Sequence, residues 1–281
     1  MKIFTKIAES RAKIRKLKDQ KRSIGLVPTM GFLHEGHFSL IKQSVKENDF
    51  TVVTVFINPL QFGEGEDFEL YPTDFKKDCE LLEKVGADMV FHPSIKELYL
   101  ENFLTKVSVK KITEKMCGQR RPGHFDGVCA VIIKLFNIFN PDNAYFGKKD
   151  YQQLQAIKKL VIDLNYDINI VGMPIIRERD GLAMSSRNAY LKDNERDSAI
   201  CLYKSFNIVG KLLSQGYRNS EDIEKGVSFF IQSFENVKID YIAIVDKETL
   251  EEIFCIDKSF LLALAVFIGK TRLIDNKIFE V

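Results

Sequence analysis

The sequence is poor in the features that define disulfide scaffolds, membrane proteins and nucleic-acid binders. Its five cysteines are odd in number, lie far apart and form no Cys-x-x-Cys pair, which predicts reduced, mostly buried thiols in a cytoplasmic protein. No apolar run approaches the ~20 residues of a membrane span, and residues 1–22 lack the apolar core of a secretory signal. A net charge of +2 gives no reason to expect nucleic acid or a membrane as partner of the whole chain.

The remaining composition is that of an ordinary globular protein. Apolar residues make up 45% of the chain and charged residues 28%, and 281 residues suffice for one large domain or two moderate ones. Only residues 2–22 are strongly biased, with nine Lys or Arg against two acids. Ile7, Ile14 and Leu17 recur there at roughly helical intervals. This pattern favours an amphipathic helix packed on the domain over a nucleic-acid-binding arm.

One stretch near the N-terminus predicts an anion site. The apolar run 24–27 gives way to a Pro-Thr-Met-Gly turn, and a helical pattern begins at His34. Free backbone N–H groups and the helix dipole favour a phosphate at such a helix N-terminus. Gly31 and Gly36 would let a ligand approach the backbone. His34 and His37, three residues apart, would share one face of the helix.

Two other interpretations of this histidine pair compete with phosphate binding. A half-buried histidine that packs and donates to solvent is common and needs no function. Zinc sites also use closely spaced histidines, but no third His or Cys lies near His34 and His37.

A second candidate segment follows a predicted central strand. The β-branched run Phe50–Ile57 is typical of a strand that is covered on both faces, as in parallel sheets. Ligands bind beyond the carboxyl ends of such strands, which is where Asn58 and Gln61 would lie.

Two more segments carry groups suited to phosphate. The predicted strand Asn143–Phe146 leads into Gly147-Lys148-Lys149-Asp150, which repeats the order of strand, glycine turn and helix and adds lysines. The predicted linker Pro174–Asn188 contains Met184-Ser185-Ser186-Arg187, and its two hydroxyls and guanidinium are groups that hold a triphosphate. A solvated turn and a plain linker are the alternatives.

The hydrophobic periodicity predicts an α/β fold: a Rossmann-like parallel sheet with helices on both faces over residues 1–175, and a smaller α+β domain over 176–281. Helices are predicted over 34–47, 74–85, 128–139, 151–164, 194–215 and 220–234. Further strands are predicted over 89–91, 105–109, 168–171, 237–245 and 261–268, and a basic, glycine-rich loop over 117–127.

The His-x-Gly-His motif after a Pro-Thr-Met-Gly turn resembles the signature of the nucleotidylyltransferase superfamily. The longer string Val27–His37 is similar to that of the pantothenate synthetase family within it. Further blocks agree with this family in order and spacing, so that the resemblance spans almost the whole chain: Asn58–Phe62, Arg121–Asp150 with Gln152-Gln153, Met184–Arg187 and Gly269–Asn276.

The resemblance implies an enzyme that joins pantoate to β-alanine with ATP, through pantoyl adenylate, and that forms a homodimer. Magnesium would accompany the ATP phosphates, held mostly by them and by water, with protein ligands unknown. The family's proton donor falls on His37, for which charge stabilisation is an equally reasonable role. The implied catalytic residues are His34, His37, Lys149 and Arg187. Those implied to contact ATP are Met30, Gly31, His34, His37, Gly147, Lys148, Lys149, Asp150, Ile176, Met184, Ser185, Ser186 and Arg187. Gln61 and Gln153 match pantoate-binding positions, and Asn58 is the third predicted substrate contact.

Two departures from the family pattern concern peripheral contacts: Thr73 stands where many relatives carry arginine, and the region of Cys117 is variable.

Three alternative functions remain. Another nucleotidylyltransferase would explain the histidines and Ser185–Arg187, but not Asn58–Phe62 or Gln153. A class I tRNA synthetase would need an anticodon-binding extension that 281 residues hardly accommodate. An RNA-binding module would bind nucleic acid in a salt-sensitive way and turn over no nucleotide.

Overall fold

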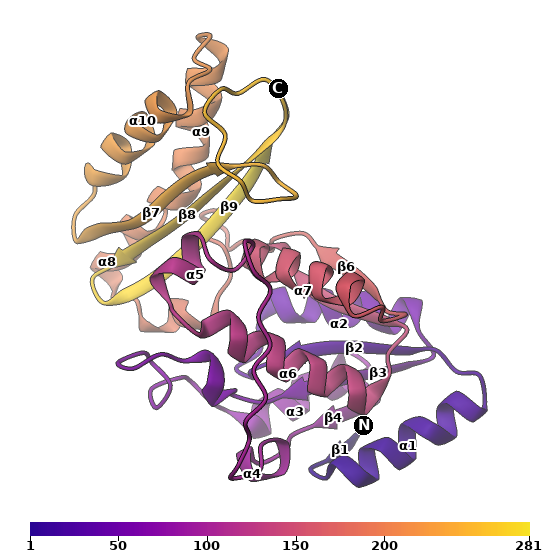
Figure 1. Ribbon diagram of the computed structural model, residues 1–281. Helices are drawn as coiled ribbons and strands as arrows, with labels where there is room; N and C mark the ends of the chain where they lie inside the picture. Colours follow the sequence, from indigo (N-terminus) through magenta and orange to yellow (C-terminus); the bar gives the residue numbers. More distant parts are fainter.

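A computed structural model describes residues 1–281 and contains two sheets, each with its own helices (Figure 1). The first is a six-stranded, wholly parallel sheet of order β1-β4-β3-β2-β5-β6. Its strands are β1 (Lys2–Phe4), β2 (Ile24–Thr29), β3 (Phe50–Val55), β4 (Met89–Phe91), β5 (Asn143–Gly147) and β6 (Asn169–Met173). The parallel α/β sheet predicted from the sequence is confirmed.

Helices cover both faces of this sheet, and each face has its own apolar cluster. One cluster joins strand residues such as Leu26 and Val52 to α1 (Ile7–Asp19), α6 (His124–Phe139) and α7 (Tyr151–Asp163). The other joins residues such as Val27 and Val53 to α2 (Glu35–Glu47) and α3 (Phe75–Lys84). Because both faces are covered, every residue of β3 is buried, as its β-branched run predicts.

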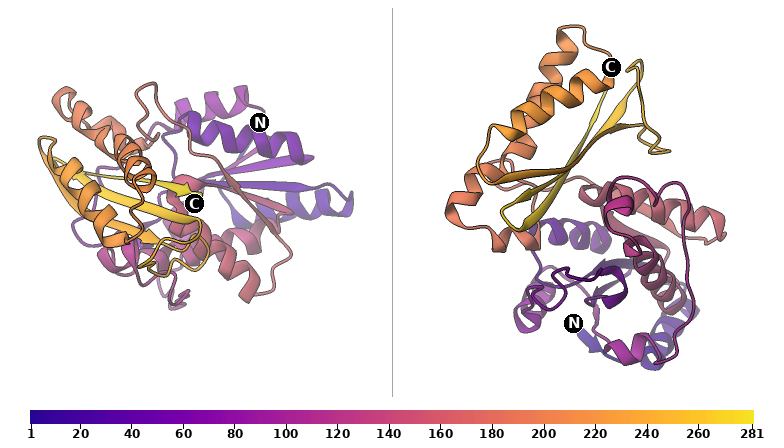
Figure 2. Two further views of the ribbon diagram at one scale, coloured as in Figure 1. Left: turned by 90° about the horizontal axis from the view of Figure 1, so that it is seen from above. Right: turned by 60° about the vertical axis from the view of Figure 1, so that its left-hand side comes forward.

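The second sheet is antiparallel, of order β7-β8-β9, with β7 (Val237–Val245), β8 (Phe260–Ile268) and β9 (Thr271–Phe279). It packs on α9 (Cys201–Ser214) and α10 (Ser220–Gln232), which lie on the side turned away from the first sheet (Figures 1 and 2). The smaller α+β domain is therefore confirmed. Its boundary at residue 175 stays a prediction.

The two domains meet through a small apolar cluster and a cleft. Met116, on α5 (Met116–Arg120), packs against residues of the second sheet such as Val245 and Leu261. The Tyr151 hydroxyl donates to the Lys247 carbonyl at 3.0 Å beside this cluster. The remaining short elements are α4 (Ile95–Leu98), α8 (Asp193–Ala199) and the 3₁₀ helices η1 (Pro59–Gln61), η2 (Lys148–Asp150) and η3 (Ser186–Tyr190).

Several elements differ from the sequence predictions. The strand predicted over 105–109 is wrong: Val107 and Val109 pack on α6 and α7 instead of pairing with a strand, so their alternation marks burial only. The helix predicted over 194–215 is two helices, α8 and α9, separated at Ile200. Helix α6 begins at His124, after Gly123 in the left-handed conformation (φ +82°), and therefore earlier than predicted.

Two strands, β1 and β9, were not predicted at all. Strand β1 is only three residues long, too short to show an alternating pattern. Strand β9 buries the polar side chains Asp275 and Asn276, which conceals its pattern.

The cysteines are less buried than the sequence predicts. All five thiols are free, but only Cys129 and Cys201 are buried, while Cys79 and Cys117 are half-buried and Cys255 is exposed. The prediction of mostly buried thiols is therefore wrong. No helix has the length and apolar content that crossing a bilayer requires.

Candidate active site

The candidate site lies where the order of strands reverses. Strands β2 and β5 are neighbours in the sheet. From β2 the chain continues to β3 and β4 on one side, and from β5 it continues to β6 on the other side. The loops that leave the carboxyl ends of β2 and β5 diverge there and open a crevice, the usual ligand position in such sheets. A cavity of about 240 Å³ lies at this point.

Most of the predicted site residues line this cavity together, although they come from five separate segments of the chain. These are Met30, His34, His37, Asn58, Gln61, Gly147, Lys149, Asp150, Gln153, Ile176, Met184, Ser185, Ser186 and Arg187. Two predicted residues, Gly31 and Lys148, do not line it, and the Lys148 side chain is exposed.

The turn after β2 is held by a buried carboxylate. Asp78 of α3, only 2% exposed, accepts from the backbone N–H groups of Phe32 and Leu33, both at 2.8 Å. Gly31 has φ +88°, and a Cβ there would lie 3.0 Å from both the Asp78 carboxylate and the Val55 side chain. Gly31 therefore makes room for the side chains of Asp78 and Val55. From the sequence alone, this glycine is expected to make room for a ligand.

The two histidines form a reciprocal cap on the first turn of α2. The Gly36 N–H donates to His34 Nδ1 at 3.1 Å, and the His34 N–H donates to His37 Nδ1 at 3.3 Å. A Cβ on Gly36 would lie 2.8 Å from the His34 ring, so this glycine makes room for the imidazole. Because each Nδ1 accepts, each neutral ring carries its proton on Nε2 and has that N–H free to donate to a ligand.

The surroundings keep both rings uncharged. Burial, followed by the charge of Lys149, lowers the pKa of His34 to about 4. Burial, followed by His34 and Lys149, holds the pKa of His37 well below its ordinary value. The ring centroids are 4.1 Å apart. The pair therefore offers two neutral donors near pH 7, beside a lysine.

Lys149 supplies the cation of the site. It lies in η2, directly after β5, with its side chain 19% exposed and its Nζ 3.9 Å from the Asp150 carboxylate. Lys149 lines the same cavity as the two histidines, and its charge contributes to the lowered pKa of each.

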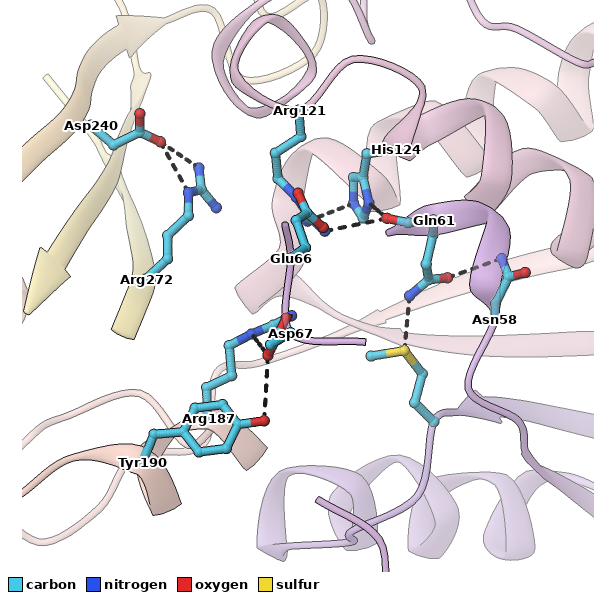
Figure 3. Close-up of polar contacts among 11 residues, drawn as sticks. Asn58, Gln61, Glu66, Asp67, Arg121, His124, Arg187, Tyr190, Asp240 and Arg272 are labelled. Atoms are coloured by element: carbon cyan, nitrogen blue, oxygen red, sulfur yellow. Dashed lines mark hydrogen bonds and ion pairs between the residues drawn. The ribbon is translucent and has the colours of Figure 1, made fainter. Parts of the chain in front are cut away.

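Gln61, the last residue of η1, is held by Met30 of the turn after β2 and by Asn58, which precedes η1. Its Nε2 donates to the Met30 sulfur at 2.8 Å, and its Oε1 accepts from Asn58 Nδ2 at 3.2 Å (Figure 3). Asn58 is 1% exposed; its amide also donates to the Gly127 carbonyl at 2.9 Å and accepts from the Tyr99 hydroxyl at 2.9 Å. Asn58 thus orients Gln61, and its own polar atoms are engaged within the protein.

Two arginines at the cavity are paired with adjacent carboxylates of one loop (Figure 3). Arg121 donates to both oxygens of Glu66, at 2.7 and 2.5 Å. Arg187 donates to both oxygens of Asp67, at 2.9 and 2.7 Å, and its guanidinium lies 5.7 Å from the centre of the Tyr71 ring. Bidentate pairs of this kind are strong and fix the planes of both groups.

The segment after β6 brings its hydroxyls to the same place. Ser186 donates to the Phe32 carbonyl at 3.3 Å, which joins η3 to the turn after β2. The Ser185 hydroxyl accepts from the Arg187 N–H at 3.3 Å and thereby caps the N-terminus of η3. Ser185, Ser186 and Arg187, which the resemblance implies contact ATP, thus line the same cavity as the two histidines.

His124 links the Gln61 loop to Arg121. Its Nδ1 lies 2.7 Å from the Gln61 carbonyl and its Nε2 3.2 Å from an Arg121 Nη, so the neutral ring donates from Nδ1 and accepts at Nε2. Burial, followed by the Arg121 charge, lowers the pKa of His124 to about 4. No local pattern indicates its contact with Gln61, which lies 63 residues away along the chain.

The lowered pKa values of His34 and His124 predict how the unfolding free energy depends on pH. Between about pH 4 and 6.5 the unfolded chain binds more protons at His34 and His124 than the folded chain does, so the unfolding free energy should fall as pH is lowered through this window. The expected loss is of the order of 2 kcal/mol for each imidazole. Urea unfolding of the wild type and of His124→Asn, measured across the window, checks this. Equal slopes for the two proteins would contradict it.

No group of three or more His, Cys, Asp or Glu side chains in the structure could hold a metal ion by itself. Of the two departures noted in the sequence, Thr73 is exposed and lines neither the cavity nor the wider cleft between the domains. Cys117 lines that cleft, which has a volume of about 980 Å³ and adjoins the cavity at Arg121, Lys149 and Gln153.

Comparison with known proteins agrees over the whole chain. The family model for pantoate-beta-alanine ligase matches residues 2–278. A pantothenate synthetase of Caldicellulosiruptor saccharolyticus is 53% identical over 281 residues, 100% of each chain, and one of Clostridium botulinum is 50% identical over 280 residues.

Solved structures agree as well. The crystal structure of pantothenate synthetase from Thermus thermophilus is 40% identical, with a TM-score of 0.93 over 99% of each chain. A pantoate-beta-alanine ligase of Francisella tularensis, solved with beta-gamma ATP and β-alanine, is 35% identical, with a TM-score of 0.80 over 99% of this chain and 97% of that one.

Proposed function

The chain belongs to the pantoate-beta-alanine ligase family, and from that premise we propose how its side chains divide the reaction. The enzyme joins pantoate and β-alanine at the expense of ATP. A pantoate carboxylate oxygen attacks the α-phosphorus, which forms pantoyl adenylate and expels pyrophosphate. The β-alanine nitrogen then attacks the acyl carbon, loses a proton and expels AMP. The observation that carries the division of roles is the convergence of His34, His37, Lys149, Arg187 and Gln153 on one cavity.

His34 and His37 stabilise charge on the phosphates during the first step. Negative charge grows on the bridging and leaving oxygens as pyrophosphate departs, and preorganised donors lower this barrier because they need no reorientation. Both rings have Nδ1 occupied by backbone N–H groups and a lowered pKa, so each presents an uncharged Nε2–H. This supports hydrogen-bond donation over proton transfer as the role of His37.

Lys149 and Arg187 neutralise the triphosphate. Lys149 lies in η2, directly after β5, and Arg187 lies in η3, in the segment that follows β6. Arg187 is engaged by Asp67 through Nε and one Nη in this structure, so a phosphate can bind its remaining N–H groups or replace that carboxylate. The Ser185 hydroxyl is a further donor beside it, and the Ser186 hydroxyl becomes one when it turns from the Phe32 carbonyl to a phosphate. Met30, Gly147, Asp150, Ile176 and Met184 complete the nucleotide site that we propose.

Gln61 and Gln153 hold pantoate, and Asn58 acts on it through Gln61. Replacing Gln153 by alanine should raise the KM for pantoate by ~10-fold or more and leave the KM for ATP nearly unchanged, since one hydrogen bond to a charged group contributes about 1.5–3 kcal/mol. Gln152 is the matched control. It is 7% exposed, and its amide is used by the Cys117 N–H and the carbonyls of Ile112 and Lys115.

Gln152→Ala should therefore lower thermal stability and leave both KM values close to wild type. Steady-state kinetics with each substrate varied in turn, together with thermal melts, distinguish the two variants. Equal losses for pantoate and ATP in Gln153→Ala would refute the assignment of Gln153.

Magnesium enters with ATP. Since the chain offers no group of acidic or imidazole ligands for a resident ion, the phosphates and water supply most of its coordination. Calorimetry should then detect submillimolar Mg²⁺ binding only when ATP is present; comparable binding by the protein alone would refute this. The metal supplies charge neutralisation on the phosphates when bound.

We also propose a cytoplasmic homodimer, as the family resemblance implies. Sedimentation equilibrium at micromolar concentration measures the mass directly, and a value near that of the 32.3 kDa chain would refute the dimer.

A further inference from the structure

We propose that Asp275 and Asn276 of β9 are positioning residues for adenylation, because together they fasten both phosphate-binding segments to one point of the second domain. This inference rests on the proposed roles of Lys149 and of Met184–Arg187. Both residues lie on the cleft wall, buried to 2% and 7% exposure, and neither lines the smaller cavity that holds the histidines.

Asn276 holds the lysine turn. Its Nδ2 donates to two consecutive carbonyls across the domain interface, that of Lys148 at 3.0 Å and that of Lys149 at 2.8 Å. An amide has two N–H groups, so each carbonyl receives one. With both carbonyls engaged, the peptide planes on either side of the Lys149 Cα are fixed, and its side chain is held at the cavity that His34 and His37 line.

Asp275 holds the other segment through Arg177. Its two oxygens accept from the Arg177 guanidinium at 2.6 and 3.0 Å, and the Asp275 side chain is 1% exposed. The same guanidinium donates to the Gly181 carbonyl at 2.9 Å and lies 4.7 Å from the centre of the Tyr203 ring. Arg177 is therefore held by a carboxylate, a carbonyl and an aromatic ring.

From Arg177 the restraint passes along the backbone to the serine segment. Arg177 and Ala183 form an isolated antiparallel β-bridge. Two backbone hydrogen bonds flank it: the Glu178 N–H donates to the Leu182 carbonyl at 2.8 Å, and the Met184 N–H donates to the Ile176 carbonyl at 3.0 Å. This closed turn ends at Met184, directly before Ser185. The orientation of the segment that carries Arg187 thus depends on the Asp275–Arg177 pair.

The two halves are also joined to each other. The Asn276 N–H donates to Asp275 Oδ1 at 2.8 Å, so the carboxylate and the amide have a fixed mutual orientation. A buried carboxylate left without its cation is strongly unfavourable, which makes the Asp275–Arg177 contact a rigid one, unlike an exposed ion pair. One strand of the second domain therefore sets the distance between the Lys149 turn and the Arg187 segment.

The test uses the full chain and pantoate-dependent exchange of labelled pyrophosphate into ATP. Asn276→Ala should lower kcat/KM for ATP by ~10–100-fold and leave the KM for pantoate within ~2-fold of wild type, because the loosened turn carries Lys149 and not Gln61. Asn219→Ala is the control: the Asn219 side chain accepts from the Glu221 N–H at 2.8 Å to cap α10 in the same domain. It should lower stability by about 1 kcal/mol with unchanged kinetics.

A double-variant cycle separates positioning from a general loss of structure. If Asn276 acts through Lys149, adding Asn276→Ala to Lys149→Met should cost less than ~3-fold further, whereas independent effects would multiply. If Asn276→Ala does not fold at the assay temperature, Asn276→Ser, which keeps one donor, takes its place in the cycle.

The outcomes are distinct. No exchange by the wild-type chain would overturn the proposed function. Normal exchange by the wild type, with unchanged kcat/KM for ATP in a folded Asn276 variant or with multiplying effects in the cycle, would overturn the positioning role alone.

Discussion

Replacing His37 by alanine is expected to slow formation of pantoyl adenylate by at least ~10²-fold, the usual cost of removing a preorganised donor from a site where charge develops. The ring meets the requirement for such a donor. Its Nδ1 is occupied by the His34 N–H, and burial together with His34 and Lys149 holds its pKa well below the ordinary value, so the Nε2–H is fixed and uncharged. Single-turnover measurement of adenylate formation gives the rate, and a rate near that of the wild type would remove His37 from the mechanism.

His37→Gln distinguishes the two roles that the sequence left open. A glutamine amide can place an N–H near the position of Nε2 but has no proton to transfer at neutral pH. If His37 donates a hydrogen bond, the glutamine variant should recover ~10-fold or more over alanine. If His37 transfers a proton, glutamine and alanine should be equally slow.

Lys149→Met is expected to slow the same step by ~10²–10³-fold, which corresponds to about 3–4 kcal/mol of transition-state stabilisation. The expected loss is large because the ammonium is mostly buried beside the histidine pair, where water screens its charge poorly. Methionine retains most of the length of the side chain, so the loss measures the charge and not an empty space.

The neighbouring Lys148 provides a control with the same chemistry. Its side chain is exposed and lies outside the cavity, although it was predicted to contact ATP along with Lys149. Lys148→Met should therefore change the adenylation rate by less than ~3-fold. Equal losses from the two substitutions would mean that only the overall charge of the turn matters, and would contradict a specific role for Lys149.

Features that depend on local sequence patterns could be predicted, and contacts between distant segments could not. Segments with a long apolar run or a clear apolar period were predicted well, among them β3, predicted over 50–57, and α10, predicted over 220–234. Some residue types that converge on the cavity were also identifiable, because His34, Asn58, Gln61 and Lys149 follow predicted strands, whereas Gln153, Ile176 and Met184–Arg187 were assigned by the family resemblance. Positions that follow such strands meet at one edge of a parallel sheet.

The contacts that orient those residues were not predictable. Arg187 and Asp67 are separated by 120 positions, and Arg177 and Asp275 by 98, so no local pattern connects them. The polar residues of β9 were likewise hidden, because a buried Asp-Asn pair breaks the alternation by which strands are recognised. Asn58 was predicted as a substrate contact from its position alone. Its amide is instead engaged by Tyr99 and Gly127, which the sequence separates from it by 41 and 69 residues.

The central claim is that this cavity activates pantoate as an acyl adenylate, and pantoate-dependent exchange of labelled pyrophosphate into ATP tests it most directly. The assay contains Mg²⁺ and omits β-alanine, so that the first step runs reversibly and the second cannot follow. The account predicts exchange that requires pantoate, is lost in Lys149→Met, and gives way to AMP release when β-alanine is added. Folded wild-type protein that shows no exchange with pantoate would contradict the account.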